Sequence, residues 1–187
     1  MKENKSIEQR CNFETERLKV QSWKNQITEP PNEQDFAKKV VKILTTNVTK
    51  NLPDGWQNID STTKANNWIK NRSEESSFLT VQLLSNHEIV GFVFLYESVS
   101  VGNFVELRLG FLLSETVWGK GVGSELIKGL VNWCENNTDI ISISGGVELE
   151  NVGSIRVMQK NGFFISTSDI KQENMVFLER KFDRKNF

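Results

Sequence analysis

The feature that most constrains the fold is a glycine-rich stretch, VWGKGVGS at residues 117–124, which runs directly into a helical pattern. Gly119, Gly121 and Gly123 occupy alternate positions, and residues 125–136 carry apolar side chains at helical spacing. Glycine is costly beside a helix unless the backbone turns with a positive φ or another group approaches closely. The pattern therefore predicts a tight loop that leads into a helix N-terminus.

The first N–H groups of a helix have no partner within the helix, and the helix dipole adds partial positive charge there. A glycine loop at that end can hold an anion, most often phosphate, although it can also be only a turn. The Walker pattern is absent because Gly121 follows Lys120, and G-x-G-x-G differs from the dinucleotide-binding G-x-G-x-x-G. The loop therefore suits a ligand that carries phosphate without transferring it, such as coenzyme A.

Composition limits the function classes. The 187 residues are 37% hydrophobic and 25% charged with a net charge of −1, which predicts one soluble domain over residues 1–187, with 1–12 as a flexible tail. The sequence has no long basic run that would favour nucleic-acid binding, and it has no run of about 18 apolar residues that would favour a membrane span. Two cysteines (Cys11 and Cys134) and one histidine (His87) argue against a metal site, and the expected compartment is the cytoplasm.

The periodicity predicts an α+β fold. Strands are expected at 13–23, 78–85, 88–98, 104–113, 139–149, 163–170 and 174–182. Helices are expected at 35–48, 61–76, 125–136 and 151–161. The three successive strands between residues 78 and 113 favour an antiparallel meander.

Two stretches together resemble a known family. LRLGFLLSETVWGKGVGSELIKGLV (107–131), followed by NVGSIRVMQKNGF (151–163), resembles the GNAT N-acetyltransferases. The likeness is closest to the ribosomal-protein-alanine branch (RimJ/RimL type), in which "ERL" opens the first strand as Glu16-Arg17-Leu18 does here. The resemblance covers about residues 13–182 and is weakest over 25–76. It implies a single domain with a central mixed, mostly antiparallel sheet of about seven strands, splayed at the acyl-CoA site and flanked by about four helices.

The same resemblance implies acetyl-CoA as the cosubstrate and assigns its contacts. Phe111, Leu112 and Leu113 match the strand that packs the pantetheine arm, and Asn151 matches the side chain that hydrogen-bonds this arm. The backbone amides of the loop match the pyrophosphate site: Gly119, Lys120, Gly121, Val122, Gly123 and Ser124. Trp118 precedes them, either supporting the loop or contacting the cosubstrate.

Acetyl transfer needs a base for the amine and a donor for the departing thiolate. Met158 stands where many members have a tyrosine, and Ser154 falls on the serine that takes the thiolate role in the ribosomal branch. Ser154 could instead bond only to helix backbone. Arg108 stands where that branch often has a glutamate. Glu106 shares its face and could act as base through water, or could pair with Arg108.

The acceptor is expected to be a primary amine. Arg108 in the acceptor groove would favour a carboxylate near that amine. Trp56 and Trp68 either belong to the core or form an aromatic wall of the groove. The candidates are the N-terminal alanine or serine of a ribosomal or other protein, and a small amine such as an amino acid, polyamine or aminoglycoside. A non-catalytic acyl-CoA-binding module is the alternative from another class. A homodimer through the strand after Gly162 is left open.

Overall fold

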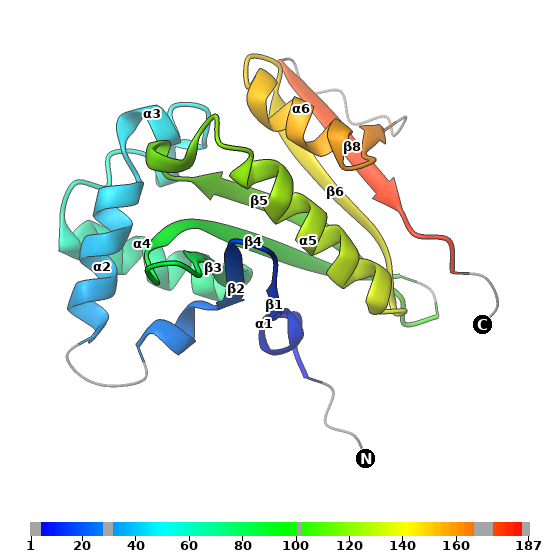
Figure 1. Ribbon diagram of the computed structural model, residues 1–187, viewed down its shortest axis with the longest axis horizontal. Helices are drawn as coiled ribbons and strands as arrows, with labels where there is room; N and C mark the ends of the chain where they lie inside the picture. The colour runs from blue at the N-terminus through cyan, green and yellow to red at the C-terminus, as the bar shows by residue number, and fades with distance from the viewer. Residues whose placement is uncertain (1–4, 28–31, 101, 167–173, 185–187) are drawn as a thin grey trace.

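The computed structural model describes residues 5–27, 32–100, 102–166 and 174–184 (Figure 1). Within these residues eight strands form one sheet in the order β1-β2-β3-β4-β5-β6-β8-β7. The strands are β1 (Phe13–Glu14), β2 (Leu18–Ser22), β3 (Ser77–Leu83), β4 (Ile89–Val99), β5 (Val105–Leu113), β6 (Ile140–Glu148), β7 (Phe164–Ile165) and β8 (Met175–Lys181). The α-helices are α1 (Ile7–Arg10), α2 (Asn32–Ile43), α3 (Thr46–Thr49), α4 (Thr62–Glu75), α5 (Val122–Asn136) and α6 (Val152–Lys160). Short 3-10 turns are η1 (Trp23–Gln26), η2 (Asp54–Trp56) and η3 (Glu115–Val117).

The sheet is mixed and mostly antiparallel, as the family resemblance implies. β3, β4 and β5 form the expected antiparallel meander. Among the strands of the described residues, only β5 and β6 pair in parallel, and α5 provides the crossover between them. This single parallel pair lies in the middle of the sheet, and the candidate site is built around it.

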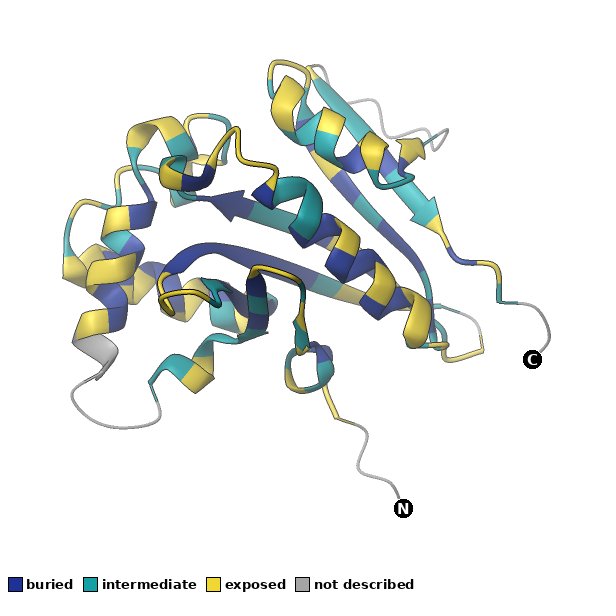
Figure 2. Cartoon of the chain, viewed as in Figure 1, coloured by how far each residue is buried: buried dark blue, intermediate teal, exposed yellow. Residues whose placement is uncertain are grey.

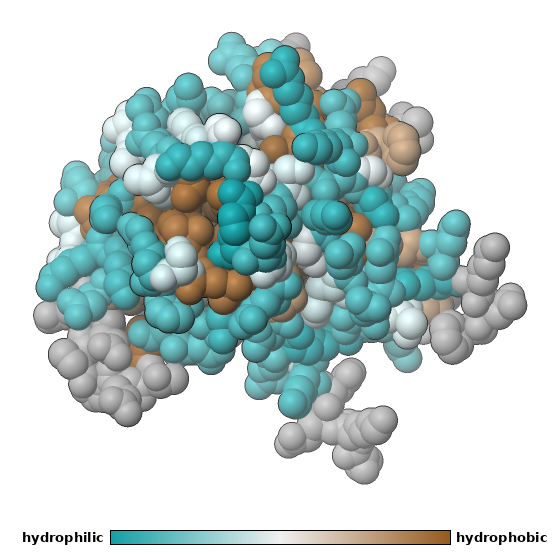
Figure 3. Space-filling model, viewed as in Figure 1, coloured by the Kyte–Doolittle hydropathy of each residue, from teal (hydrophilic) through white to brown (hydrophobic). Residues whose placement is uncertain are grey.

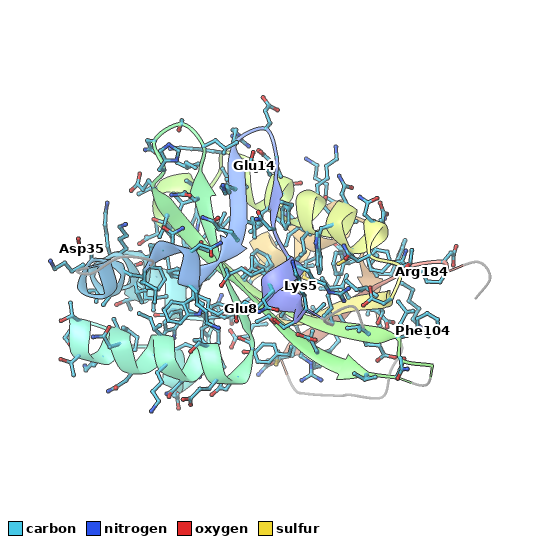
Figure 4. All side chains as sticks on the ribbon, turned by 90° about the horizontal axis from the view of Figure 1, so that it is seen from below. Lys5, Glu8, Glu14, Asp35, Phe104 and Arg184 are labelled. Atoms are coloured by element: carbon cyan, nitrogen blue, oxygen red, sulfur yellow. The ribbon has the colours of Figure 1, made fainter. Side chains whose placement is uncertain are left out.

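Helices cover both faces of the sheet. α5 and α6 lie on the face that is nearest the viewer in Figure 1, and Figure 4 shows α4 on the opposite side of the strands from α5. Successive residues of β4 alternate between two cores, because side chains of a strand point to opposite faces. Val93 and Leu95 join the core under α5 and α6, whereas Phe92 and Phe94 join an aromatic core under α2 and α4. Figure 2 shows buried residues alternating with exposed ones along α5, and the buried apolar ones belong to the first of these cores.

The expectation of a flexible tail over residues 1–12 is wrong from residue 5 onward, while residues 1–4 lie outside the described part. Ser6 and Gln9 form a capping box that begins α1. Ile7 is 1% exposed and Cys11 is fully buried, so this segment belongs to the core. Arg10 forms an ion pair with Asp139 beyond the end of α5.

The other end of the chain also secures α5. Arg184, which is labelled in Figure 4, donates hydrogen bonds to the carbonyl oxygens of Cys134, Glu135 and Asn137 at 2.7–3.0 Å. Last-turn carbonyls of a helix lack intrahelical donors, so these bonds satisfy them. Cys134 itself is fully buried, as its position on the apolar helix face predicts.

The counts of elements differ slightly from expectation. The short elements α1, α3 and β1 carry too few residues for a periodic signal, which is why about four helices and seven strands were expected. The helix expected over 35–48 is two helices, because Thr45 leaves helical geometry and caps α3. Of the strand expected over 163–170, Phe164–Ile165 is present, and residues 167–170 lie outside the described part.

The described residues contain no helix long and apolar enough to cross a membrane. Figure 3 shows the face seen in Figure 1 as mostly hydrophilic, with hydrophobic residues confined to a few places. The most exposed large apolar side chains include Phe164 and Ile165 of the edge strand β7. A dimer through this strand stays a prediction.

Two glycines in neighbouring strands give a matched test of the packing between β4 and β5. An added Cβ at Gly91 would overlap the Leu112 carbonyl oxygen and lie 2.6 Å from Leu113 Cδ2, whereas at Gly110 it would meet only Phe94 at 3.8 Å. We expect Gly91→Ala to lower the free energy of unfolding by about 1–3 kcal/mol through overpacking. Gly110→Ala should change it by less than about 0.5 kcal/mol. Urea denaturation of both variants is the measurement, and equal effects would contradict the packing described.

Candidate active site

The two central parallel strands part halfway along their length. β5 pairs with β6 only from Val105 to Arg108, with Ser144 as the last partner. β5 continues to Leu113 against β4, and β6 continues to Glu148 against β8. The inner edges of residues 109–113 and 145–148 therefore face a gap instead of each other.

Backbone groups of β5 point into this gap. The N–H of Ser114 donates to the Val90 carbonyl oxygen of β4 at 2.7 Å. Because N–H groups alternate sides along a strand, those of Phe111 and Leu113 point away from β4 and into the gap. A ligand with amide groups can pair with such an edge as an added strand would.

A cavity of about 570 Å³ opens at this gap. It brings together eleven of the residues that the resemblance assigns to the cosubstrate or to catalysis: Phe111, Leu112, Leu113, Trp118, Gly119, Gly121, Val122, Gly123, Ser124, Asn151 and Ser154. Residues from three separate parts of the sequence thus line one space, which supports the expected grouping.

The glycine loop delivers free N–H groups to this cavity. Gly119 and Gly121 have φ values of 71° and 78°, a region that residues with a side chain rarely adopt. Gly121 is the N-cap of α5 and offers no side-chain acceptor, and the first helical bond runs from Glu125 N to Gly121 O. Within the described residues no acceptor takes the N–H of Val122, Gly123 or Ser124. These three unpaired donors lie at the positive end of a helix, where an anion can bind.

The N-terminus of α6 faces the same cavity. The Asn151 Oδ1 atom accepts from the Ser154 N–H at 3.2 Å and so caps this helix. The amide nitrogen of Asn151 stays available as a donor. The Ser154 Oγ atom makes no hydrogen bond within the described chain, so the reading of Ser154 as a serine that only bonds backbone is not what the structure has.

The far wall of the cavity was not expected from the sequence. Asn47, Val48, Lys50, Asn51 and Leu52, in and just after α3, line it together with Val117, Glu150, Val152, Gly153 and Val157. Glu115 holds α3 in place, accepting from Thr45 Oγ1 at 2.5 Å and Asn47 Nδ2 at 2.8 Å. These two hydrogen bonds lower the pKa of Glu115 and keep it ionised. Their partners are about 70 residues apart in sequence, so no local pattern signals them.

Two predicted cosubstrate residues support the loop. The Trp118 Nε1 atom donates to the Leu113 carbonyl oxygen at 2.8 Å, although 46% of the residue is exposed beside the cavity. The Lys120 side chain does not line the cavity. Its Nζ atom donates to the Thr116 carbonyl oxygen at 2.7 Å, so of Lys120 only the backbone belongs to the loop that forms the site.

Glu106 and Arg108 lie outside this cavity on the opposite face of β5. Both are exposed, whereas Val105, Leu107 and Leu109 are buried on the α5 side. The pair that the sequence allowed between them does not form, since neither side chain makes an ion pair within the described residues. Arg108 is the last residue of β5 that pairs with β6, so it stands where the strands part.

Tyr96 lies directly opposite Arg108 in the β4–β5 ladder, and sequence reasoning missed it. Burial raises the pKa of Tyr96, while the guanidinium groups of Arg72 and Arg108 act in the opposite direction. Tyr96 therefore stays a protonated hydroxyl at neutral pH. Arg72 is only 6% exposed, pairs with Glu75, and has no partner for its Nε atom within the described residues. The register of β4 and β5 places Tyr96 opposite Arg108, and the end of α4 adds Arg72.

The two tryptophans expected in the acceptor groove differ in position. Trp68 is 2% exposed and packs against Phe78 and Phe94 in the aromatic core. Its predicted contact with the substrate is therefore wrong, because it has no surface to offer. Trp56 is half-buried above it, with the Arg72 guanidinium 4.4 Å from its ring centroid. Only Trp56 offers surface to a ligand.

Met158 and the two cysteines take core roles. Met158 is 1% exposed, and its Cε atom lies 3.1 Å from the Cβ position of Gly145, so it fills the space under β6. Burial raises the pKa of Cys11 and that of Cys134, the latter to about 12. Among the described residues no three His, Cys, Asp or Glu side chains gather as metal ligands would.

Comparisons with known proteins identify the family. The model of the acetyltransferase (GNAT) domain family matches residues 27–164. The probable N-acetyltransferase YjcK of Bacillus subtilis (strain 168) is 29% identical over 79 residues, a match that spans 42% of this chain and 43% of that protein, less than half of its length.

Two solved structures share the fold. A GNAT-family acetyltransferase from Bacillus anthracis has a TM-score of 0.70 and 17% identity, with 91% of this chain and 98% of that chain covered. RimL, a ribosomal L7/L12 alpha-N-protein acetyltransferase solved in complex with coenzyme A, has a TM-score of 0.68 and 14% identity, with 91% and 97% covered. The family model covers most of the chain, and the chain therefore belongs to the GNAT family, the acetyl-CoA-dependent N-acetyltransferases.

Proposed function

We propose that the protein transfers acetyl from acetyl-CoA to a primary amine whose molecule carries a carboxylate near that amine. The observation that carries the acceptor class is the position of Arg108, unpaired and exposed at the point where β5 and β6 part. An amine must be neutral to attack, and a cationic wall disfavours a purely cationic acceptor. A guanidinium binds a carboxylate through two parallel hydrogen bonds, which would also orient the amine.

Neighbouring groups support an anion-binding acceptor side. Tyr96, opposite Arg108 in the ladder, keeps its hydroxyl protonated, and Arg72 adds a second guanidinium, which pairs with Glu75. Trp56 covers Arg72 and offers an aromatic surface. These groups come from the end of α4, from η2 and from two strands, so the acceptor side is set by the fold.

The proposed cosubstrate site follows from the cavity. The N–H groups of Val122, Gly123 and Ser124 bind the diphosphate, because they are unpaired and stand at a helix N-terminus. Asn151 donates its side-chain amide to the pantetheine arm, which lies along β5 from Phe111 to Leu113. The cavity includes all of these residues.

In the proposed reaction the chain supplies hydrogen bonds to each charge that develops. A gap-facing N–H of β5, from Phe111 or Leu113, donates to the thioester oxygen as it gains charge. Ser154 donates its hydroxyl proton in a hydrogen bond to the departing sulfur. Glu106 takes the amine proton through water, since it lies two residues beyond Arg108, roughly 6–7 Å farther from the gap at about 3.3 Å per residue.

The finer assignment to the ribosomal-protein-alanine branch is part of the proposal. It is supported by Glu16-Arg17-Leu18 at the start of β2 and by the serine at 154. A protein N-terminus with an acidic residue close behind it meets the carboxylate requirement, as does a free amino acid. A non-catalytic acyl-CoA-binding module remains the competing function, since Met158 and Arg108 replace two groups common in the family.

The acceptor class is tested with matched pairs of amines. Thiol release from acetyl-CoA is measured with Ala-Glu against Ala-Gln dipeptides, and with amino acids against their amides. We expect the carboxylate member of each pair to have a kcat/KM about tenfold higher or more, the effect of a charge-assisted hydrogen bond. Arg108→Gln should reduce this ratio to near one, whereas Lys38→Gln, which removes an exposed charge on α2, should leave it unchanged.

Each part of the proposal fails separately in this assay. Equal rates for acid and amide members would refute the carboxylate requirement while leaving acetyl transfer intact. Acetyl-CoA binding without thiol release for any amine would favour the binding-module reading.

Ser154→Ala tests the thiolate role. The substitution removes Oγ but leaves the Asn151 cap, which binds the backbone N–H of residue 154. Turnover at saturating acetyl-CoA should fall by roughly 10²–10⁴-fold, the range for acid–base groups, with little change in acetyl-CoA affinity. Ser73→Ala, on the exposed side of α4, is the control. A Ser154→Ala rate within threefold of the parent would assign the thiolate to water.

A further inference from the structure

The turn between β1 and β2 is fastened to the first turn of α5. Glu125 accepts hydrogen bonds from Thr15 Oγ1 at 2.6 Å, from the Arg17 backbone N–H at 2.8 Å and from Arg17 Nε at 2.6 Å. Burial opposes the charged form of Glu125, but these three hydrogen bonds outweigh it and lower its pKa. The carboxylate therefore stays ionised at neutral pH, with both oxygens committed to this turn.

Arg17 also forms a hydrogen bond to the glycine loop. Its Nη1 atom donates to the Lys120 carbonyl oxygen at 3.0 Å. With Nε on Glu125 and Nη1 on the loop, the guanidinium plane is fixed from two sides. Its Nη2 atom has no partner within the described residues and lies 3.7 Å from the Cβ position of Gly121. About 43% of the side chain is exposed, so a ligand at the loop can meet it.

The free Nη2 atom stands next to the N-terminus of α5. Gly121 lines the main cavity and also a second cavity of about 690 Å³ that runs along α5 past Thr15, Glu125 and Lys128. An anion that accepted hydrogen bonds from the N–H groups of residues 122–124 would lie close to Gly121, the residue that Arg17 Nη2 approaches. The Glu125 carboxylate neutralises part of the positive charge of Arg17. Its oxygens bind the β1–β2 turn, however, and the guanidinium lies between this carboxylate and the glycine loop.

We propose that Arg17 is a cosubstrate-binding residue that donates from Nη2 to the diphosphate of acetyl-CoA, with Glu125 and the Lys120 carbonyl fixing its orientation. This rests on the proposed cosubstrate site. It makes the turn before β2, more than 100 residues away in sequence, a wall of that site. It also gives the Glu16-Arg17-Leu18 sequence a physical role, because the arginine binds the diphosphate and Leu18, which is fully buried, anchors the strand.

Three ligands separate the phosphate groups of the cosubstrate. Acetyl-CoA carries a diphosphate and a ribose 3′-phosphate, 3′-dephospho-acetyl-CoA retains only the diphosphate, and S-acetyl-pantetheine carries neither. Dissociation constants are measured by calorimetry, or by competition for the weak ligand. Binding alone is measured, so no acceptor is needed.

We expect Arg17→Gln to weaken acetyl-CoA and the dephospho form by a similar factor of about ten or more, and S-acetyl-pantetheine by less than twofold. Arg17→Lys should be intermediate, since one ammonium cannot bridge Glu125, Lys120 O and a phosphate together. Lys38→Gln is the charge control and should change none of the three.

The remaining outcomes overturn the proposal. Equal weakening of all three ligands means that Arg17 only holds the turn. Weakening of acetyl-CoA alone assigns Arg17 to the 3′-phosphate. No weakening at all removes Arg17 from the site. If the parent protein fails to bind acetyl-CoA, the proposed function itself fails, a result distinct from any of these.

Discussion

The structure depends on the point at which β5 and β6 stop pairing. A parallel ladder in the middle of a sheet would normally continue, because unpaired backbone groups are costly when buried. Here each strand keeps its outer partner along its length, β4 for β5 and β8 for β6, so the sheet stays whole while its centre opens. The gap therefore leaves free amide groups in the protein interior, which an amide-bearing ligand can satisfy.

The two faces of the sheet beside this gap carry different charged groups. On the α5 and α6 side, two helix N-termini and three unpaired N–H groups concentrate positive potential where a diphosphate would lie. On the other face, the positive charges of Arg72 and Arg108 and the negative charge of Glu75 act on the Tyr96 hydroxyl. In the proposed function both sides bind an anion, and the intervening strand β5 presents Phe111 and Leu113 to the neutral pantetheine arm. In this account one strand separates a cosubstrate phosphate from an acceptor carboxylate and brings their reacting groups together.

Local sequence was sufficient where local physics decides the structure. The tight loop before α5 was predicted from a few consecutive residues, and Gly119 and Gly121 adopt positive φ there. The element order and the meander followed from periodicity in the same way. Contacts across the fold could not be predicted, because they depend on packing between distant segments. Examples are the hydrogen bond of Glu115 to α3, that of Arg17 to the loop, and the pairing of Tyr96 with Arg108. Trp68 and residues 5–12 were misjudged for that reason, since their burial depends on neighbours that are far away in sequence.

A crystal structure with bound coenzyme A tests the central claim most directly. The account predicts that the pantetheine arm lies between β5 and β6 and pairs with the backbone of Phe111 to Leu113. The diphosphate should accept hydrogen bonds from the N–H groups of residues 122–124 at about 2.7–3.2 Å, and the sulfur should lie beside Ser154 Oγ. Coenzyme A bound elsewhere, or β5 and β6 paired along their full length in the crystal, would contradict it.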